Sequence, residues 1–144
     1  MHNPFENAMA QLDKVAQINK SLGQEFLARL REPDRDIRIS IPIKMDDGRM
    51  KVFEGYRVEY NNALGPYKGG IRYHPDTEIN EVKALAFWMA LKCAVAGIPM
   101  GGGKGGITVD PKTLSKGELE RLSRGWVQRL GDILGPKKMC QHQT

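Results

Sequence analysis

The chain has 144 residues, of which 40% are hydrophobic and 27% are charged, proportions that indicate one soluble globular domain. They exclude a disordered tail and a fibre. Lys92, Gly97 and Pro99 interrupt the longest apolar stretch, so we expect no membrane-spanning helix and no membrane partner. The net charge of +5 comes from 22 basic and 17 acidic residues that are interspersed along the chain. Composition therefore leaves a basic nucleic-acid-binding domain open only as an alternative.

The N-terminus has neither the basic nor the apolar segment of a secretory signal. Cys93 and Cys140 form no disulfide framework, and no ligand spacing indicates a metal site. We therefore expect a reducing, cytoplasmic location.

The first segment predicts a helix that ends at Pro33, with some drift of the apolar pattern near Gly23. Asn3 can cap this helix, Pro4 suits its first position, and Glu6 follows three residues after the cap.

Strict alternation of isoleucines over residues 37–43 predicts a half-buried strand, and Pro42 places it near a sheet edge. Asp47 and Gly48 give a hairpin turn signal, so a return strand is expected over about residues 50–60. A connection rich in Gly, Asn and Pro then covers residues 61–70, and a short segment at residues 71–73 follows it.

Helical spacing resumes at Asn80 and stops at Gly97. Residues 99–106 are expected to form a glycine-rich loop, followed by a short strand at residues 107–109. Ser115 and Glu118 predict a capping box for a last helix, which Gly135 and Pro136 end. The alternating elements predict an α/β fold: an N-terminal helix and a mixed β-sheet with helices packed on it.

Three lysines lie in unusual surroundings. Lys92 shares the apolar face of the predicted helix, so it either extends to water from the rim of that face or meets an anion. Lys104 lies among five glycines, and Lys68 precedes the pair Gly69 and Gly70. For Lys104 and Lys68, an ordinary lysine in a surface loop remains the alternative.

If the three lysines converge, the site carries a charge of up to +3. A dicarboxylate would neutralise two of the ammonium groups, and the third could then act as a general base. Gly101, Gly103 and Gly106 also fit the dinucleotide pattern G-x-G-x-x-G, but a helix precedes them and a strand follows, which is the reverse of the required order.

Four segments in order closely resemble the N-terminal, substrate-binding and oligomerisation domain of glutamate dehydrogenases: Gly65–Tyr73, Glu81–Ala86, Lys92–Val95 and Pro99–Gly106. The resemblance runs from about Asn3 to Lys138. It implies that Lys68 binds the substrate side-chain carboxylate and Lys92 the α-carboxylate. It also implies that Lys104 is the catalytic lysine, which helps to activate water for attack on an iminium intermediate.

Related leucine, phenylalanine and valine dehydrogenases resemble the regions of Lys92 and Lys104 but have no lysine matching Lys68, so Lys68 points to glutamate. The resemblance ends in the C-terminal residues. A catalytic Asp of the family would fall on position 144, where this chain has Thr144, and residues 139–144 do not resemble the family. The Rossmann domain that follows in the family is absent, so we expect a truncated, frameshifted or isolated domain: residues 1–138, with a tail at 139–144.

The resemblance implies a parent enzyme that uses NAD or NADP for the reversible oxidative deamination of L-glutamate to 2-oxoglutarate and ammonia. It also implies assembly as a homo-oligomer, which is a hexamer in the family. We expect this chain alone to be inactive and to bind no coenzyme tightly. A non-catalytic module that oligomerises or binds dicarboxylates is the first alternative, and a nucleic-acid binder is the second.

Overall fold

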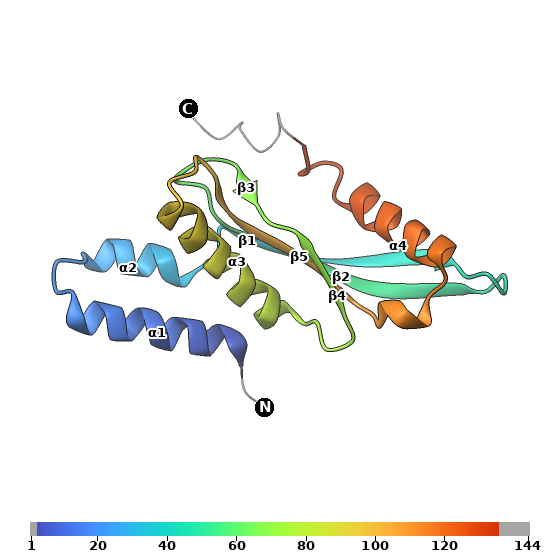
Figure 1. Cartoon of the computed structure of the whole chain (residues 1–144), viewed down its shortest axis with the longest axis horizontal. Coiled ribbons are helices and arrows are strands. Elements are labelled where there is room, and N and C mark those ends of the chain that lie inside the picture. The colour runs from blue at the N-terminus through green and yellow to red at the C-terminus, as the bar shows by residue number, and fades with distance from the viewer. Residues whose placement is uncertain (1–2, 136–144) are drawn as a thin grey trace.

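The computed structural model describes residues 3–135 as a mixed β-sheet with helices on both of its faces, which confirms the predicted α/β class (Figure 1). The elements, in chain order, are α1 (Pro4–Ile18), α2 (Gln24–Arg31), β1 (Arg35–Lys44), β2 (Met50–Asn61), β3 (Tyr67–Lys68), β4 (Ile71–His74), α3 (Ile79–Val95), β5 (Gly101–Thr108), a 3-10 turn (Pro111–Thr113) and α4 (Lys116–Arg129). Within that range no helix is both long and apolar enough to cross a bilayer.

The sheet is built around β5. Strands β1 and β2 form the predicted antiparallel hairpin, in which Ile41 pairs with Phe53. Strand β2 then pairs antiparallel with β5, while β3 and β4 both run parallel to β5. Strand β1 is therefore at the edge of the sheet, as Pro42 indicated.

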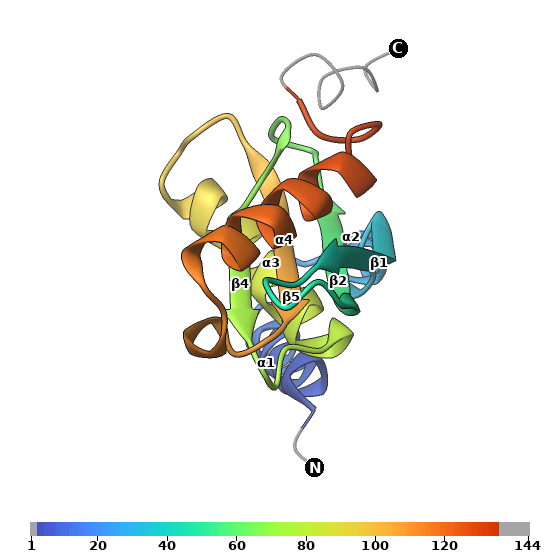
Figure 2. The same cartoon turned by 90° about the vertical axis from the view of Figure 1, so that its right-hand side faces the viewer.

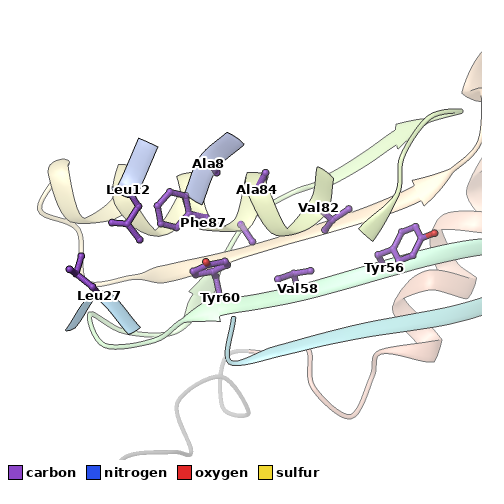
Figure 3. Close-up of a cluster of buried hydrophobic side chains, with 10 residues drawn as sticks. Ala8, Leu12, Leu27, Tyr56, Val58, Tyr60, Val82, Ala84 and Phe87 are labelled. Atoms are coloured by element: carbon purple, nitrogen blue, oxygen red, sulfur yellow. The ribbon is translucent and has the colours of Figure 1, made fainter. Parts of the chain in front are cut away.

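Two apolar clusters hold the helices on opposite faces of the sheet. Helices α1 and α3 pack on one face, where Phe87 contacts Tyr60 edge to face with ring centroids 5.4 Å apart (Figure 3). Helix α4 packs on the other face (Figure 2). There Trp126 and Leu122 belong to one buried cluster with Ile41 and Ile107. The strand alternation explains this division, because neighbouring residues of β2 point to opposite faces.

The helices differ from the sequence expectation in two places, near Gly23 and at the C-terminal end of α4. The single N-terminal helix is in fact two helices, because α1 ends at Ile18 and Gly23 caps α2. The Asn3 cap is confirmed, since its side chain accepts from the backbone nitrogens of Phe5 and Glu6. The Ser115–Glu118 capping box of α4 is also confirmed, but α4 ends at Arg129 rather than at Gly135, and Pro136 lies outside the described residues.

The glycine-rich segment is a strand, so the predicted loop at residues 99–106 is wrong. The glycines remove side chains from β5 at places where helices approach its backbone. A Cβ atom at Gly102 would lie 2.4 Å from the backbone nitrogen of Ala90, and one at Gly105 would lie 2.6 Å from Cζ2 of Trp126. The same composition that indicated a loop therefore allows close packing of α3 and α4 on opposite faces of one strand.

Candidate functional site

Lys104 lies within strand β5, with its side chain half-buried. Positions 102 and 106 both face α3. A Cβ at Gly102 would meet Ala90, and one at Gly106 would meet Val82, and both residues belong to α3. Alternate residues of a strand share a face. Lys104 therefore projects from β5 on the same side as α3.

Lys68 ends strand β3 and is exposed. It pairs in register with Gly102, and paired residues of neighbouring strands point to the same face, so Lys68 also lies on the α3 side. Lys68 and Lys104 thus lie on adjacent strands, rather than in the glycine-flanked turns that the sequence predicted.

Hydrogen bonds join the two lysine-bearing segments. The amide of Gly101 donates to the carbonyl of Pro66, and that of Gly105 donates to the carbonyl of Gly70, both at 2.8 Å. Only a glycine fits at position 69, where a Cβ would lie 1.5 Å from the carbonyl oxygen of Gly103. Glycines on both strands therefore let these segments approach each other closely.

Lys92 lies in the last turn of α3 and is exposed. Of the two alternatives left by the sequence, its exposure fits the one in which Lys92 extends to water from the rim of the apolar face, and the desolvation argument for a nearby anion is lost. The C-terminal end of α3 nevertheless lies at the same end of the molecule as β3 and the start of β5 (Figure 1). The fold thus brings the segments that carry all three lysines to one end of the sheet.

The ammonium groups of Lys68, Lys92 and Lys104 make no hydrogen bond or ion pair with any other residue in the range 3–135. Acidic side chains around the N-terminal part of α3 are paired with other basic groups: Glu81 with Arg72 at 3.1 Å, and Asp36 with Lys83 at 2.6 Å. Most arginines of the described chain also pair with acidic residues. Lys68, Lys92 and Lys104 thus carry positive charges that no acidic group of residues 3–135 pairs with.

Sequence reasoning missed a polar cluster on the opposite face of the same strands. The Tyr67 hydroxyl donates to Oδ2 of Asp34 at 2.9 Å, and the Arg57 guanidinium donates to the Tyr67 carbonyl at 3.5 Å. Arg57 is only 3% exposed, and burial lowers its pKa. Burial and the bond to Asp34 raise the pKa of Tyr67. The sequence pattern that could have predicted this cluster lies in β2, where the charged residues Arg57 and Glu59 alternate with apolar ones.

The dinucleotide-like glycines do not fit a coenzyme. The backbone of Asn61 and Gly65 occupies the space beside Gly101, Arg57 and Tyr67 that beside Gly103, and Thr77 and Val82 that beside Gly106. No backbone there is left open to a pyrophosphate group. The described part of the chain also holds no cluster of three or more His, Cys, Asp or Glu side chains that could bind a metal ion.

Comparison with solved structures identifies the class of domain. The chain superposes on hetero-hexameric glutamate dehydrogenase from Thermus thermophilus, in its Leu-bound form, with a TM-score of 0.88 and 39% identity. The match covers 94% of this chain and 33% of that one. The fold is thus that of an amino-acid dehydrogenase N-terminal domain.

The family follows from the sequence matches. Residues 33–141 match the profile described as Glu/Leu/Phe/Val dehydrogenase, dimerisation domain, and the chain belongs to this family. It is 53% identical to an NAD-specific glutamate dehydrogenase from Clostridioides difficile over 94% of its length, and 48% identical to an NADP-specific one from Synechocystis over 92%. It spans about a third of each relative, 32% and 31%.

The domain boundary at residue 138, the tail at 139–144 and Thr144 lie outside the described residues. They stay predictions.

Proposed function

We propose that this chain provides the substrate-binding and subunit-assembly part of an NAD(P)-dependent glutamate dehydrogenase. The reaction of that enzyme is the reversible oxidative deamination of L-glutamate to 2-oxoglutarate and ammonia. Two relatives that are 53% and 48% identical carry the names of NAD-specific and NADP-specific glutamate dehydrogenases, which supports the assignment. A cytoplasmic location stays a prediction from the sequence.

The observation that carries the proposal is the set of unpaired lysines on segments at one end of the sheet. Lys68 would bind the side-chain carboxylate of the substrate, and Lys92 its α-carboxylate. Each contact would be a charge-assisted hydrogen bond, and two ammonium groups would neutralise the two negative charges of the ligand. The presence of Lys68 favours glutamate over an apolar amino acid.

Lys104 is the proposed catalytic residue. It is half-buried and pairs, within β5, with Val58 of β2, whereas Lys68 and Lys92 are exposed. With two lysines engaged by carboxylates, Lys104 would move a proton to or from the water that reacts at the substrate's α-carbon.

We assign no coenzyme-holding role to the described residues, because the spaces beside the β5 glycines are filled by other residues. For the parent enzyme the coenzyme would be NAD or NADP. We expect the chain by itself to show no glutamate-dependent reduction of either coenzyme, an expectation that a hydride-transfer assay tests.

A second candidate function is a non-catalytic module that assembles with copies of itself and binds dicarboxylates. The filled glycine sites of β5 and the dimerisation-domain profile favour it as an account of this chain alone. Turnover by the purified chain would exclude this second candidate.

Ligand-dependent thermal unfolding tests the lysine assignments. Glutarate should raise the melting temperature more than butyrate at equal concentration and ionic strength, because only glutarate can engage both Lys68 and Lys92. Lys68→Ala should erase the difference between the two ligands, and Lys92→Ala should reduce the shifts from both. A tenfold loss of affinity lowers the stabilisation at saturating ligand by about 1.4 kcal/mol.

Lys112→Ala is the matched control, because Lys112 is exposed and lies in the 3-10 turn after β5. It should behave like the wild type. Equal shifts with glutarate and butyrate in the wild-type chain would remove the assignment of Lys68.

A further inference from the structure

Strand β3 consists of only Tyr67 and Lys68, and Lys68 is the residue expected to distinguish a dicarboxylate from a monocarboxylate. Its side chain is exposed and makes no contact with another charged group in the range 3–135. A long, unpaired side chain loses conformational entropy when it binds, and a mobile backbone would add to that loss. The preference of Lys68 for a dicarboxylate over a monocarboxylate therefore depends on how firmly the backbone at residue 68 is held.

Tyr67, the residue before it, is held at two points. Its hydroxyl donates to Oδ2 of Asp34 at 2.9 Å. Its carbonyl, which belongs to the peptide group shared with Lys68, accepts from the guanidinium of Arg57 at 3.5 Å. The two contacts come from different parts of the chain, so they restrain both the side chain and the backbone of β3.

Both partners of Tyr67 are themselves anchored. The amide of Asp34 donates to the carbonyl of Tyr60 at 3.0 Å, which extends the β1–β2 pairing by one residue. Arg57 is 3% exposed on the central part of β2, and Glu59, two residues along the same strand, is 1% exposed. Glu59 is itself ion-paired with Arg35, whose Nε donates to Oε2 of Glu59 at 2.9 Å. The close packing around the buried Arg57 leaves its guanidinium little room to move, so it holds the Tyr67 carbonyl from a fixed position.

The restraints act from the face of the sheet opposite the lysines. A Cβ at Gly103 would lie 3.2 Å from the Cβ of Tyr67 and 3.0 Å from Arg57, so all three share one face. Strand alternation then directs Lys68 and Lys104 to the other face. Tyr67 and Arg57 thus lie away from the side on which a dicarboxylate would meet the lysines.

We propose that Asp34, Tyr67 and Arg57 form a clamp that positions Lys68 and thereby sets the selectivity of the site for dicarboxylates. This inference rests on the proposed function of Lys68. The three are positioning residues, because they act through the backbone of β3 without touching the ligand.

The test compares two tyrosine substitutions of the same kind in the full chain. Tyr67→Phe removes the hydroxyl that bonds Asp34 and leaves the ring in place. Tyr73→Phe is the matched control: the Tyr73 hydroxyl lies 2.8 Å from Oγ of Ser123 and joins β4 to α4. Dissociation constants for glutarate and butyrate are measured by calorimetry at a temperature where every variant is folded.

Tyr67→Phe and Asp34→Ala should each reduce the glutarate-to-butyrate affinity ratio by roughly three- to tenfold, the effect expected of one hydrogen bond. Asp34→Ala also removes the ion pair of Asp34 with Arg29. The double variant should therefore lose no more than Asp34→Ala alone, because the Tyr67–Asp34 bond is already absent there. Tyr73→Phe should lower stability but leave the ratio unchanged. A wild-type ratio in Tyr67→Phe would overturn the clamp while leaving the assignment of Lys68 intact.

Amide hydrogen exchange of residues 67–70 in the ligand-free chain gives an independent readout. Exchange in this segment should accelerate in Tyr67→Phe and Arg57→Met but not in Tyr73→Phe. A wild-type chain without preference for glutarate would overturn the proposed function, whereas unchanged exchange in both clamp variants would overturn the clamp itself.

Discussion

At the scale of single residues, glycine has a packing role in this protein. Gly102, Gly105 and Gly106 lie in a central strand and are each approached by side chains or backbone from another element. Lys104 is placed between two of them, so the backbone that carries it is fixed by helix packing as well as by strand pairing. The position of the proposed catalytic lysine therefore depends on residues that have no side chain of their own.

Gly102→Ala should destabilise the chain strongly. The added methyl carbon would lie 2.4 Å from the backbone nitrogen of Ala90 and 2.6 Å from the carbonyl oxygen of Ala86, and neither backbone atom can move without shifting α3. We expect the free energy of unfolding in urea to fall by about 2 kcal/mol or more.

Gly70→Ala is the control for this substitution, because no atom lies within 4 Å of the corresponding position and its φ is not positive. It should change stability by less than about 1 kcal/mol. Equal effects of the two substitutions would contradict the close packing of α3 on β5.

At the scale of elements, the β1–β2 turn is fastened to the start of α4. The side chain of Asp46 accepts from the Ser115 hydroxyl at 2.6 Å and from Arg121 at 2.5 Å. Its backbone amide donates to Oε1 of Glu118 at 3.0 Å. The same Glu118 closes the capping box, so one carboxylate serves both the helix end and the hairpin.

This link predicts a pH-dependent contribution to stability. The hydrogen bonds from Ser115 and Arg121 lower the pKa of Asp46 below its ordinary value of 3.8. A carboxyl group whose pKa is lowered on folding stabilises the fold fully above its unfolded pKa, and this contribution is lost as pH falls through the folded pKa. The stability difference between wild type and Asp46→Asn should thus be largest near pH 7 and shrink below pH 3.8.

Urea unfolding between pH 7 and pH 3 measures that difference. Glu25→Gln serves as the control, because Glu25 is exposed on α2 and forms no ion pair with another described residue. A difference between wild type and Asp46→Asn that stays constant across this range would contradict the role of the Asp46 charge.

At the scale of the whole molecule, the sheet presents an open edge. Strand β1 pairs only with β2 among the described strands, and its hairpin exposes Met50 and Val52, at 64% and 63%. Unpaired strand edges and exposed apolar side chains favour association with another chain. The dimerisation-domain profile is in agreement with such association.

We therefore expect the chain to sediment as a dimer or a larger species at micromolar concentration. Val52→Lys should shift the distribution toward the monomer, because it places a charge on the exposed hairpin. Val15→Lys provides a comparison at a similarly exposed valine, 51%, on α1. A wild-type chain that remains strictly monomeric would count against the prediction.

Much of the fold could be predicted from local patterns. The isoleucine alternation of β1, the turn at Asp47 and Gly48, and the caps at Asn3 and Ser115 each depend on residues only a few positions apart. The break between α1 and α2 was missed, because helical apolar spacing resumes after its drift near Gly23 although the chain turns there. The strand β5 was missed, because its glycines give no alternation of polar and apolar side chains.

The sequence by itself thus determined the α/β class, the hairpin, the helix caps and the three lysines that resemble a dehydrogenase substrate site. Only the tertiary structure decided that Lys104 lies on a central strand, that Lys68 shares its face of the sheet and that Lys92 is exposed. It also brought Asp34 to Tyr67. These relations join residues far apart in the chain, so they arise from strand pairing and helix packing, which leave no periodic signal in the sequence.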